Sequence, residues 1–190
     1  MSQFTTCRAT SVWLLAAFSG HALGSTLTVN ASSDAGPGNC NTTCTMRDAI
    51  ATAASNDTIA FAPGLTSPIT LSQGALVLDK ALTLQGPGAA KLTVSANNTS
   101  QVLIVSAQVS ISALTLADGF IAGSAGSNGA DGAPGAAGVS GSPGGAGGPG
   151  GLAGGACVQV ANTGALVLDH VAVRHCIAYG GPAGNGGNGG

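Results

Sequence analysis

The sequence predicts an all-β fold in which the chain winds into a parallel β-helix, a solenoid of stacked coils. Two sets of apolar residues share the offsets 0, 2, 5 and 7: Val109, Ile111, Leu114 and Leu116, and then Leu166, Leu168, Val171 and Val173. Alternation at a period of two marks a strand with one buried face, and the odd step marks a bend that keeps two strands facing one interior. A bent strand of this kind is stable only when it stacks on copies of itself, as in a solenoid.

A repeated pentapeptide is the second observation that favours stacked coils. Ala75–Asp79 reads Ala-Leu-Val-Leu-Asp, and Ala165–Asp169 repeats it without change. We therefore expect Asp79 and Asp169 to occupy equivalent corners of repeated coils.

The composition describes an uncharged and glycine-rich chain. Of 190 residues, 32 are glycine, only 6% are charged and 3% are aromatic. The protein surface must therefore consist of hydroxyl, amide and backbone groups. Five basic residues and a net charge of -2 exclude nucleic acid as a partner, because phosphate binding needs clustered Lys and Arg.

Residues 1–24 have the features of an export signal peptide. Arg8 lies in a polar start, Val12–Phe18 is an apolar run too short to span a bilayer, and Ala22–Gly24 offers small residues for cleavage. A buried first helix is the alternative. We expect the mature protein to begin near Ser25 and to be extracellular, or exposed at the outer membrane or cell surface.

Removal of the signal leaves four cysteines: Cys40, Cys44, Cys157 and Cys176. An even number in an oxidising compartment predicts disulfide bonds. The first two can close a small loop. The last two are about one coil apart, and stacked positions about 4.8 Å apart lie within the Cα range of a disulfide.

The one convincing helix is predicted over Thr45–Ala54. Thr45 and Asp48 resemble a capping box, and an apolar face is formed by four residues: Met46, Ala49, Ile50 and Ala53. We expect this helix to cover the open end of the stack of coils.

This helix also carries a resemblance. Its start is similar to the CSLREAI motif of secreted, repeat-bearing bacterial proteins with a pectin-lyase-like right-handed β-helix, at Cys44, Thr45, Met46, Arg47, Asp48, Ala49 and Ile50. The surrounding order is similar too, at Leu27–Val29, Asp34–Gly38, Asp57–Phe61, Ile69–Leu71 and Leu82–Gly88. Gly154–Cys157 resembles the glycine-led turn of polymorphic outer-membrane protein repeats, although the Phe-x-x-Asn half of that repeat is absent. The resemblance implies a right-handed β-helix in which Arg47 and Asp48 hold the cap.

Between the two sets of apolar residues, glycine recurs at every third position in ten triplets from Gly123 to Gly150, and Pro134, Pro143 and Pro149 occupy third positions. The step of three begins again at Gly181. A three-chain collagen helix is one interpretation. The other, which we favour, is an extended polyproline-II-like excursion that is pinned at both ends.

These features divide the chain into six parts: a signal peptide (1–24), an N-terminal cap (25–56), β-helix coils (57–118), a Gly-X-Y-rich loop (119–155), a further coil (156–178) and the start of a second glycine tract (179–190), where we expect a longer protein to have been truncated.

Candidate catalytic groups are few. Three acids lie at expected turns: Asp79, Asp118 and Asp169. Aspartate is favoured at turns for structural reasons, so we expect none to be catalytic. His170, Arg174 and His175 lie near Cys176, but neighbouring strand residues point to opposite faces, which disfavours zinc. We expect no cofactor and no metal.

The sequence thus favours a structural, adhesin-like protein similar to an autotransporter passenger. Its expected partners are surface glycans or proteins of host or neighbouring cells. The alternative is the amino-terminal part of a polysaccharide-active enzyme, a lyase or a glycoside hydrolase, whose catalytic coils lie further along the chain.

Overall fold

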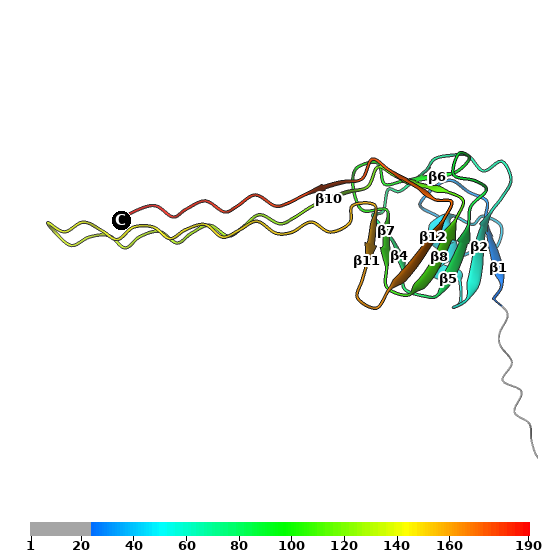
Figure 1. Cartoon of the computed structure of the whole chain (residues 1–190), viewed down its shortest axis with the longest axis horizontal. Helices are drawn as coiled ribbons and strands as arrows, with labels where there is room; N and C mark the ends of the chain where they lie inside the picture. Colours follow the sequence, from blue (N-terminus) through cyan, green and yellow to red (C-terminus); the bar gives the residue numbers. More distant parts are fainter. Residues whose placement is uncertain (1–23) are drawn as a thin grey trace, which may run out of the picture.

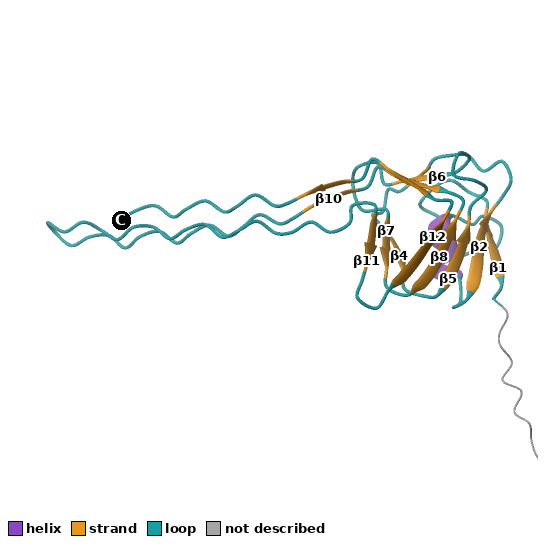
Figure 2. Ribbon diagram, in the orientation of Figure 1, coloured by secondary structure: helices purple, strands orange, loops and turns teal. Residues whose placement is uncertain are grey.

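A computed structural model describes residues 24–190, which form a block of parallel sheets and a long glycine-rich projection (Figures 1 and 2). Except for Gly24, the predicted signal peptide lies outside the described residues. The described chain is mostly strands with one short helix, in agreement with the all-β prediction. The helix is α1 (Met46–Thr52).

The strands are short. They are β1 (Thr26–Val29), β2 (Asp57–Phe61), β3 (Ile69–Thr70), β4 (Leu76–Leu78), β5 (Leu82–Gln85), β6 (Thr93–Ser95), β7 (Leu103–Val105), β8 (Gln108–Ser112), β9 (Thr115–Ala117), β10 (Phe120–Ala122), β11 (Val158–Val160), β12 (Ala165–Asp169), β13 (Ala172–Arg174) and β14 (Ile177–Tyr179).

Every strand pairing in the described chain is parallel. The strands form a five-stranded sheet (β1-β2-β5-β8-β12), a four-stranded sheet (β13-β9-β6-β3), a three-stranded sheet (β11-β7-β4) and the pair β10-β14. From β4 to β9 the chain visits the three-, five- and four-stranded sheets in turn, twice. After the glycine-rich excursion, β11, β12 and β13 repeat that order.

The predicted corner is confirmed. Ala113 and His170 adopt left-handed backbone angles, with φ of 54° and 52°, between the strands that they join. The two apolar sets also lie on neighbouring strands, in register: Leu166 beside Val109, Leu168 beside Ile111, and Val173 beside Leu116. The odd step in the sequence therefore marks a real bend.

The pentapeptide repeat, in contrast, misled the sequence analysis. Ala75–Asp79 contains β4, in the three-stranded sheet, whereas Ala165–Asp169 is β12, in the five-stranded sheet. Asp79 and Asp169 are therefore not at equivalent corners, and that prediction is wrong. An alternating pentapeptide fits any strand with one buried face, and only the spacing to the next corner determines which sheet it joins.

The sheets enclose one apolar core. Its largest fully buried side chains come from all three main sheets and from α1: Met46, Ile59, Ile69, Leu71, Leu76, Leu78, Leu84, Leu92, Leu103, Ile111, Leu114 and Leu116. The core thins out at the last coil, where inward residues such as Leu168 (42% exposed) and Val173 (47% exposed) have no further strand above them.

Helix α1 covers the opposite end of the core. It packs against β1 and β4, the outermost strands of their sheets. Thr45 and Asp48 form the predicted capping box, and the predicted apolar face, including Met46 (1% exposed) and Ala49, is buried. At the other helix end, the Lys80 ammonium donates to the carbonyl of Ala53 (2.7 Å).

Inward side chains that are register partners on neighbouring strands differ in burial, and this difference can be tested. Val94 and Val173 lie in the same column of the four-stranded sheet, on either side of Leu116, but Val94 is fully buried. Val94→Ala should lower the free energy of unfolding by about 2 kcal/mol, and Val173→Ala by less than about 1 kcal/mol. Chemical denaturation of both variants measures the difference. Equal losses would mean that the last coil is covered in solution.

Candidate functional site

The projection, here called the stalk, consists of three extended arms from one chain. The first outward arm is residues 120–135, the return arm is 139–151 and the second outward arm is 177–190. They lie side by side in a bundle that extends away from the sheets (Figure 1). The outward arms start as the parallel pair β10 and β14.

Twelve backbone hydrogen bonds join each arm to both of the others. The first outward arm donates from Gly123, Gly126, Gly129 and Gly132 to the second. The second donates from Gly181, Gly184, Gly187 and Gly190 to the return arm. The return arm donates from Ser142, Gly145, Gly148 and Gly151 to the first. One bond every third residue is the period of a polyproline II helix, which has no hydrogen bonds of its own.

The repeated glycines are needed because the arms meet at a crowded axis. A Cβ atom on Gly126 would overlap the carbonyl oxygen of Gly148, one on Gly147 would overlap that of Gly184, and one on Gly184 would overlap that of Ser127. These glycines do not adopt positive φ, so space and not backbone freedom requires them. Collagen has the same steric requirement.

The tract is therefore an excursion pinned at both ends, and it takes up a triple arrangement within a single chain. The return arm runs antiparallel to the outward arms, whereas collagen chains are parallel. The sequence predicted the excursion. It did not reveal that the first and second glycine tracts pair with each other.

Proline positions agree with the hydrogen bonds of the stalk. None of Pro134, Pro143, Pro149 and Pro182 occupies a position in the series that donates to a backbone carbonyl of another arm. Each proline therefore restricts φ to the extended region without removing a hydrogen bond between arms.

Two side chains fix the register of the outward arms. The amide N–H of Asn185 donates to Asn128 Oδ1 (3.0 Å), and the N–H of Asn188 donates to Asp131 Oδ1 (2.7 Å). One triplet nearer the sheets, the corresponding residue is Pro182, which has no N–H to satisfy. Sequence reasoning missed these pairs, although both are 57 residues apart, as are Ser112 and Asp169 in the five-stranded sheet.

A disulfide bond closes the root of the stalk. Cys157, where the chain re-enters the sheets, is bonded to Cys176, which precedes the second outward arm, with the Cα atoms 5.2 Å apart. The rings of Phe120 and Tyr179 pack there in a tilted arrangement, with their centroids 6.1 Å apart and their planes at 60°. The second expected bond, between Cys40 and Cys44, is also present.

At the opposite end, an ion pair holds the cap. The Arg47 guanidinium donates to both oxygens of the buried Asp34 carboxylate, at 2.9 and 3.0 Å, and to the carbonyl of Gly74 (2.8 Å). Burial alone would raise the pKa of Asp34, but Arg47 and the N–H groups of Ser72 and Gln73 outweigh it and hold that pKa below its usual value.

Asp48, the neighbour of Arg47 in the motif, has a different role. Its buried carboxylate accepts hydrogen bonds from the Thr45 hydroxyl (2.9 Å) and from the Gly38 N–H (2.9 Å). A Cβ atom on Gly36 would overlap this carboxylate, so the loop before the helix depends on glycine here. Arg47 and Asp48 thus link the start of α1 to the segment that precedes it and to the turn before β4.

The three candidate acids do not gather in one cluster among residues 24–190. Asp79 follows β4, Asp118 follows β9 and Asp169 ends β12, which are strands of three different sheets. Asp118 accepts from the Ser95 hydroxyl (2.7 Å) and lies 3.3 Å from His175 Nδ1.

The histidines and the cysteine near the root of the stalk are not arranged as metal ligands. Cys176 is bonded to Cys157, and His170 lies beside Asp169. Within residues 24–190, no three His, Cys, Asp or Glu side chains gather in an arrangement that could hold a metal ion.

Comparison with known proteins gives no relative: no family model, no curated protein and no solved structure matches the chain. Among residues 24–190, no helix has the length and apolar character needed to cross a bilayer. Two disulfide bonds are typical of proteins that fold in an oxidising compartment.

The ion pair at the cap should make stability depend on pH. Because the pKa of Asp34 is lowered by folding, its contribution is complete above the unfolded pKa of about 3.9 and is lost as the pH falls below it. The pKa of Asp57 is lowered by the N–H groups of Ala54 and Ser25, which adds a dependence of the same sign.

Asp34→Asn should therefore cost about 2–4 kcal/mol at pH 7 and much less near pH 2. Thermal unfolding across this pH range gives the measurement, with the exposed Asp79→Asn as the control. A loss for Asp34→Asn that does not change with pH would contradict the assignment.

The steric role of the axial glycines predicts a contrast within the stalk. Gly147→Ala should separate the arms, whereas Gly189→Ala should be tolerated because open space surrounds its Cβ position. Hydrogen exchange of residues 123–151 reports the result, with faster exchange expected only in Gly147→Ala. Similar exchange in both variants would show that the axis is not crowded.

Proposed function

We propose that the chain is a secreted or surface-exposed structural module, adhesin-like and similar to an autotransporter passenger. In this proposal the three main sheets are the faces of a right-handed parallel β-helix, and the stalk is the part displayed to the surroundings. The rotation of the chain through three sheets around one core and the CSLREAI-like cap support the architecture.

The observation that carries the proposal is the hydrogen-bonded stalk. A free glycine-rich loop would lose much conformational entropy on binding, but the arms are already ordered by twelve hydrogen bonds and by the disulfide at their root. A surface that is ordered before contact binds with less entropic cost.

The stalk surface also suits repeated weak contact. Its outward residues are mostly small, and Asp131 is the one ionisable residue between Gly119 and Gly155. Such a surface offers many similar positions along its length and no single deep pocket. Many weak contacts of this kind combine into strong attachment when several act together.

Placement of the candidate acids favours this function over the polysaccharide-cleaving alternative. Glycoside hydrolysis needs two carboxylates roughly 5–10 Å apart around one bond. Asp79 and Asp118 follow strands of two different sheets, Asp169 ends a strand of a third, and the three do not form a cluster among residues 24–190.

Attachment by coated beads tests the proposal. Beads carrying the chain through a tag before Ser25 should adhere to at least one of four surfaces: mucin, chitin, mannan or a layer of Gram-negative cells. Gly147→Val, which disrupts the stalk axis, should reduce attachment several-fold, and Gly189→Ala should not.

Two results would overturn the proposal. One is attachment that is absent on all four surfaces or is equal for both variants. The other is release of reducing or unsaturated sugar ends from pectin or mannan that disappears in Asp118→Ala, which would establish the enzyme alternative.

A further inference from the structure

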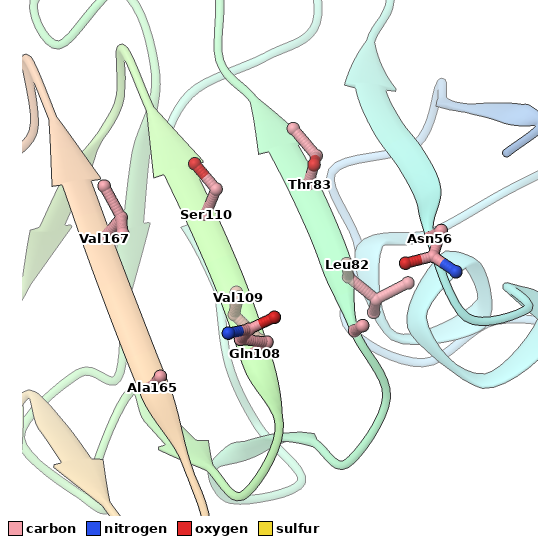
Figure 3. A pocket seen from close by; sticks show the side chains of 9 residues that line it. Asn56, Leu82, Thr83, Gln108, Val109, Ser110, Ala165 and Val167 are labelled. Carbon is pink, nitrogen blue, oxygen red and sulfur yellow. The ribbon is translucent and has the colours of Figure 1, made fainter.

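The outer face of the five-stranded sheet carries an open groove (Figure 3). Its volume is about 330 Å³, at the lower end of the range of small-molecule sites, which is about 300–1,000 Å³. The lining residues that matter here are Asn56, Thr83, Gln108, Ser110, Ala165 and Val167.

The sheet aligns the groove residues by register. Thr83, Ser110 and Val167 are register partners on β5, β8 and β12, and Figure 3 shows them in a row across the strands. Their strand neighbours Leu84 and Ile111 point into the core. The outward side chains are therefore spaced like the strands, about 4.8 Å apart.

The groove offers polar side chains that are free to bind. These are the side chains of Asn56, Thr83, Gln108 and Ser110, of which Asn56 and Gln108 are exposed and the other two are half-buried. Backbone groups of β5 and β8 are used on both sides by the parallel ladders. A ligand must therefore be recognised through hydroxyl and carboxamide groups, and these both donate and accept.

The chemistry of the lining identifies the class of ligand. No ionisable side chain lines the groove, so neither an anion nor a cation finds a partner of opposite charge. On one side, Ala165 and Val167 give an apolar wall, and Val167 is 61% exposed. A sugar ring presents hydroxyl groups at its edge and C–H groups on its face, and so matches both parts.

We propose that this groove binds a neutral polysaccharide, with the sugar hydroxyls on Thr83, Ser110 and the two carboxamides, and a ring face against Val167. The inference rests on the proposed surface-exposed role, and it names the class of partner at a site separate from the stalk. The groove is open and contains no aromatic side chain, so the affinity for a short oligosaccharide should be weak, with a Kd on the order of 1 mM.

Titration of the full chain with soluble oligosaccharides tests the groove. The probes are cellohexaose, mannohexaose and chitohexaose, with hexagalacturonate as the charged comparison. In ¹H–¹⁵N NMR spectra at least one neutral probe should shift the signals of Thr83, Ser110 and Val167, and hexagalacturonate should not.

Variants of the sheet make the test specific. The double variant Thr83→Val, Ser110→Ala keeps the strand shape and should weaken binding at least tenfold. The matched control Thr28→Val, outward on the same sheet but outside the groove, should leave binding unchanged. Val167→Trp adds an aromatic surface at an exposed position and should strengthen binding several-fold.

The outcomes separate this inference from the proposed function. The groove proposal is overturned if no neutral probe shifts the groove signals, if the double variant binds like the native chain, or if hexagalacturonate binds equally well. Stalk-dependent attachment of beads would be unaffected by any of these results, whereas Gly147→Val would reduce that attachment several-fold and leave the groove intact.

Discussion

The in-register parallel pairing of strands is the constraint on which the rest of the structure depends. It sets the columns of the core, it lines up the hydroxyl groups of Thr83 and Ser110 on the outer face, and it continues into the stalk. The separation of 57 residues between Asn128 and Asn185 equals the separation between register partners on β8 and β12 and on β9 and β13. The two outward arms of the stalk therefore keep the register of the parallel strands from which they continue.

The register of the stalk depends on local features that agree with one another. Axial glycines from the three arms alternate along the axis, so each level contains one residue without a side chain. Prolines avoid every position whose N–H group donates to a backbone carbonyl of another arm. Side chains that accept a hydrogen bond occur opposite Asn185 and Asn188 but not opposite Pro182. Agreement between independent local choices of this kind is what specifies one structure among many similar ones.

The sequence was most informative where a residue type has one physical reason to be present. The parity change at Ala113, the capping box of Thr45 and Asp48, and the cysteine spacing each predicted a local feature that the structure contains. Patterns with several possible causes were less reliable. The repeated Ala-Leu-Val-Leu-Asp fits more than one sheet, and glycine at every third position indicates a crowded axis without naming the segments that crowd it. The groove residues left no pattern in the sequence, because register alone brings Asn56, Gln108 and Val167 together.

The stalk has no apolar core of its own, and this determines how it can be stable. Its arms are joined by backbone hydrogen bonds, and these bonds act against the conformational entropy that every ordered residue loses. Three separate glycine-rich arms would not associate, because the loss of conformational entropy would exceed the gain from their hydrogen bonds. Here the sheets hold the near ends of all three arms side by side. The disulfide bond between Cys157 and Cys176 prevents the root of the stalk from opening. The coils therefore do more than present the stalk, because the alignment at the root is what allows the bundle to form.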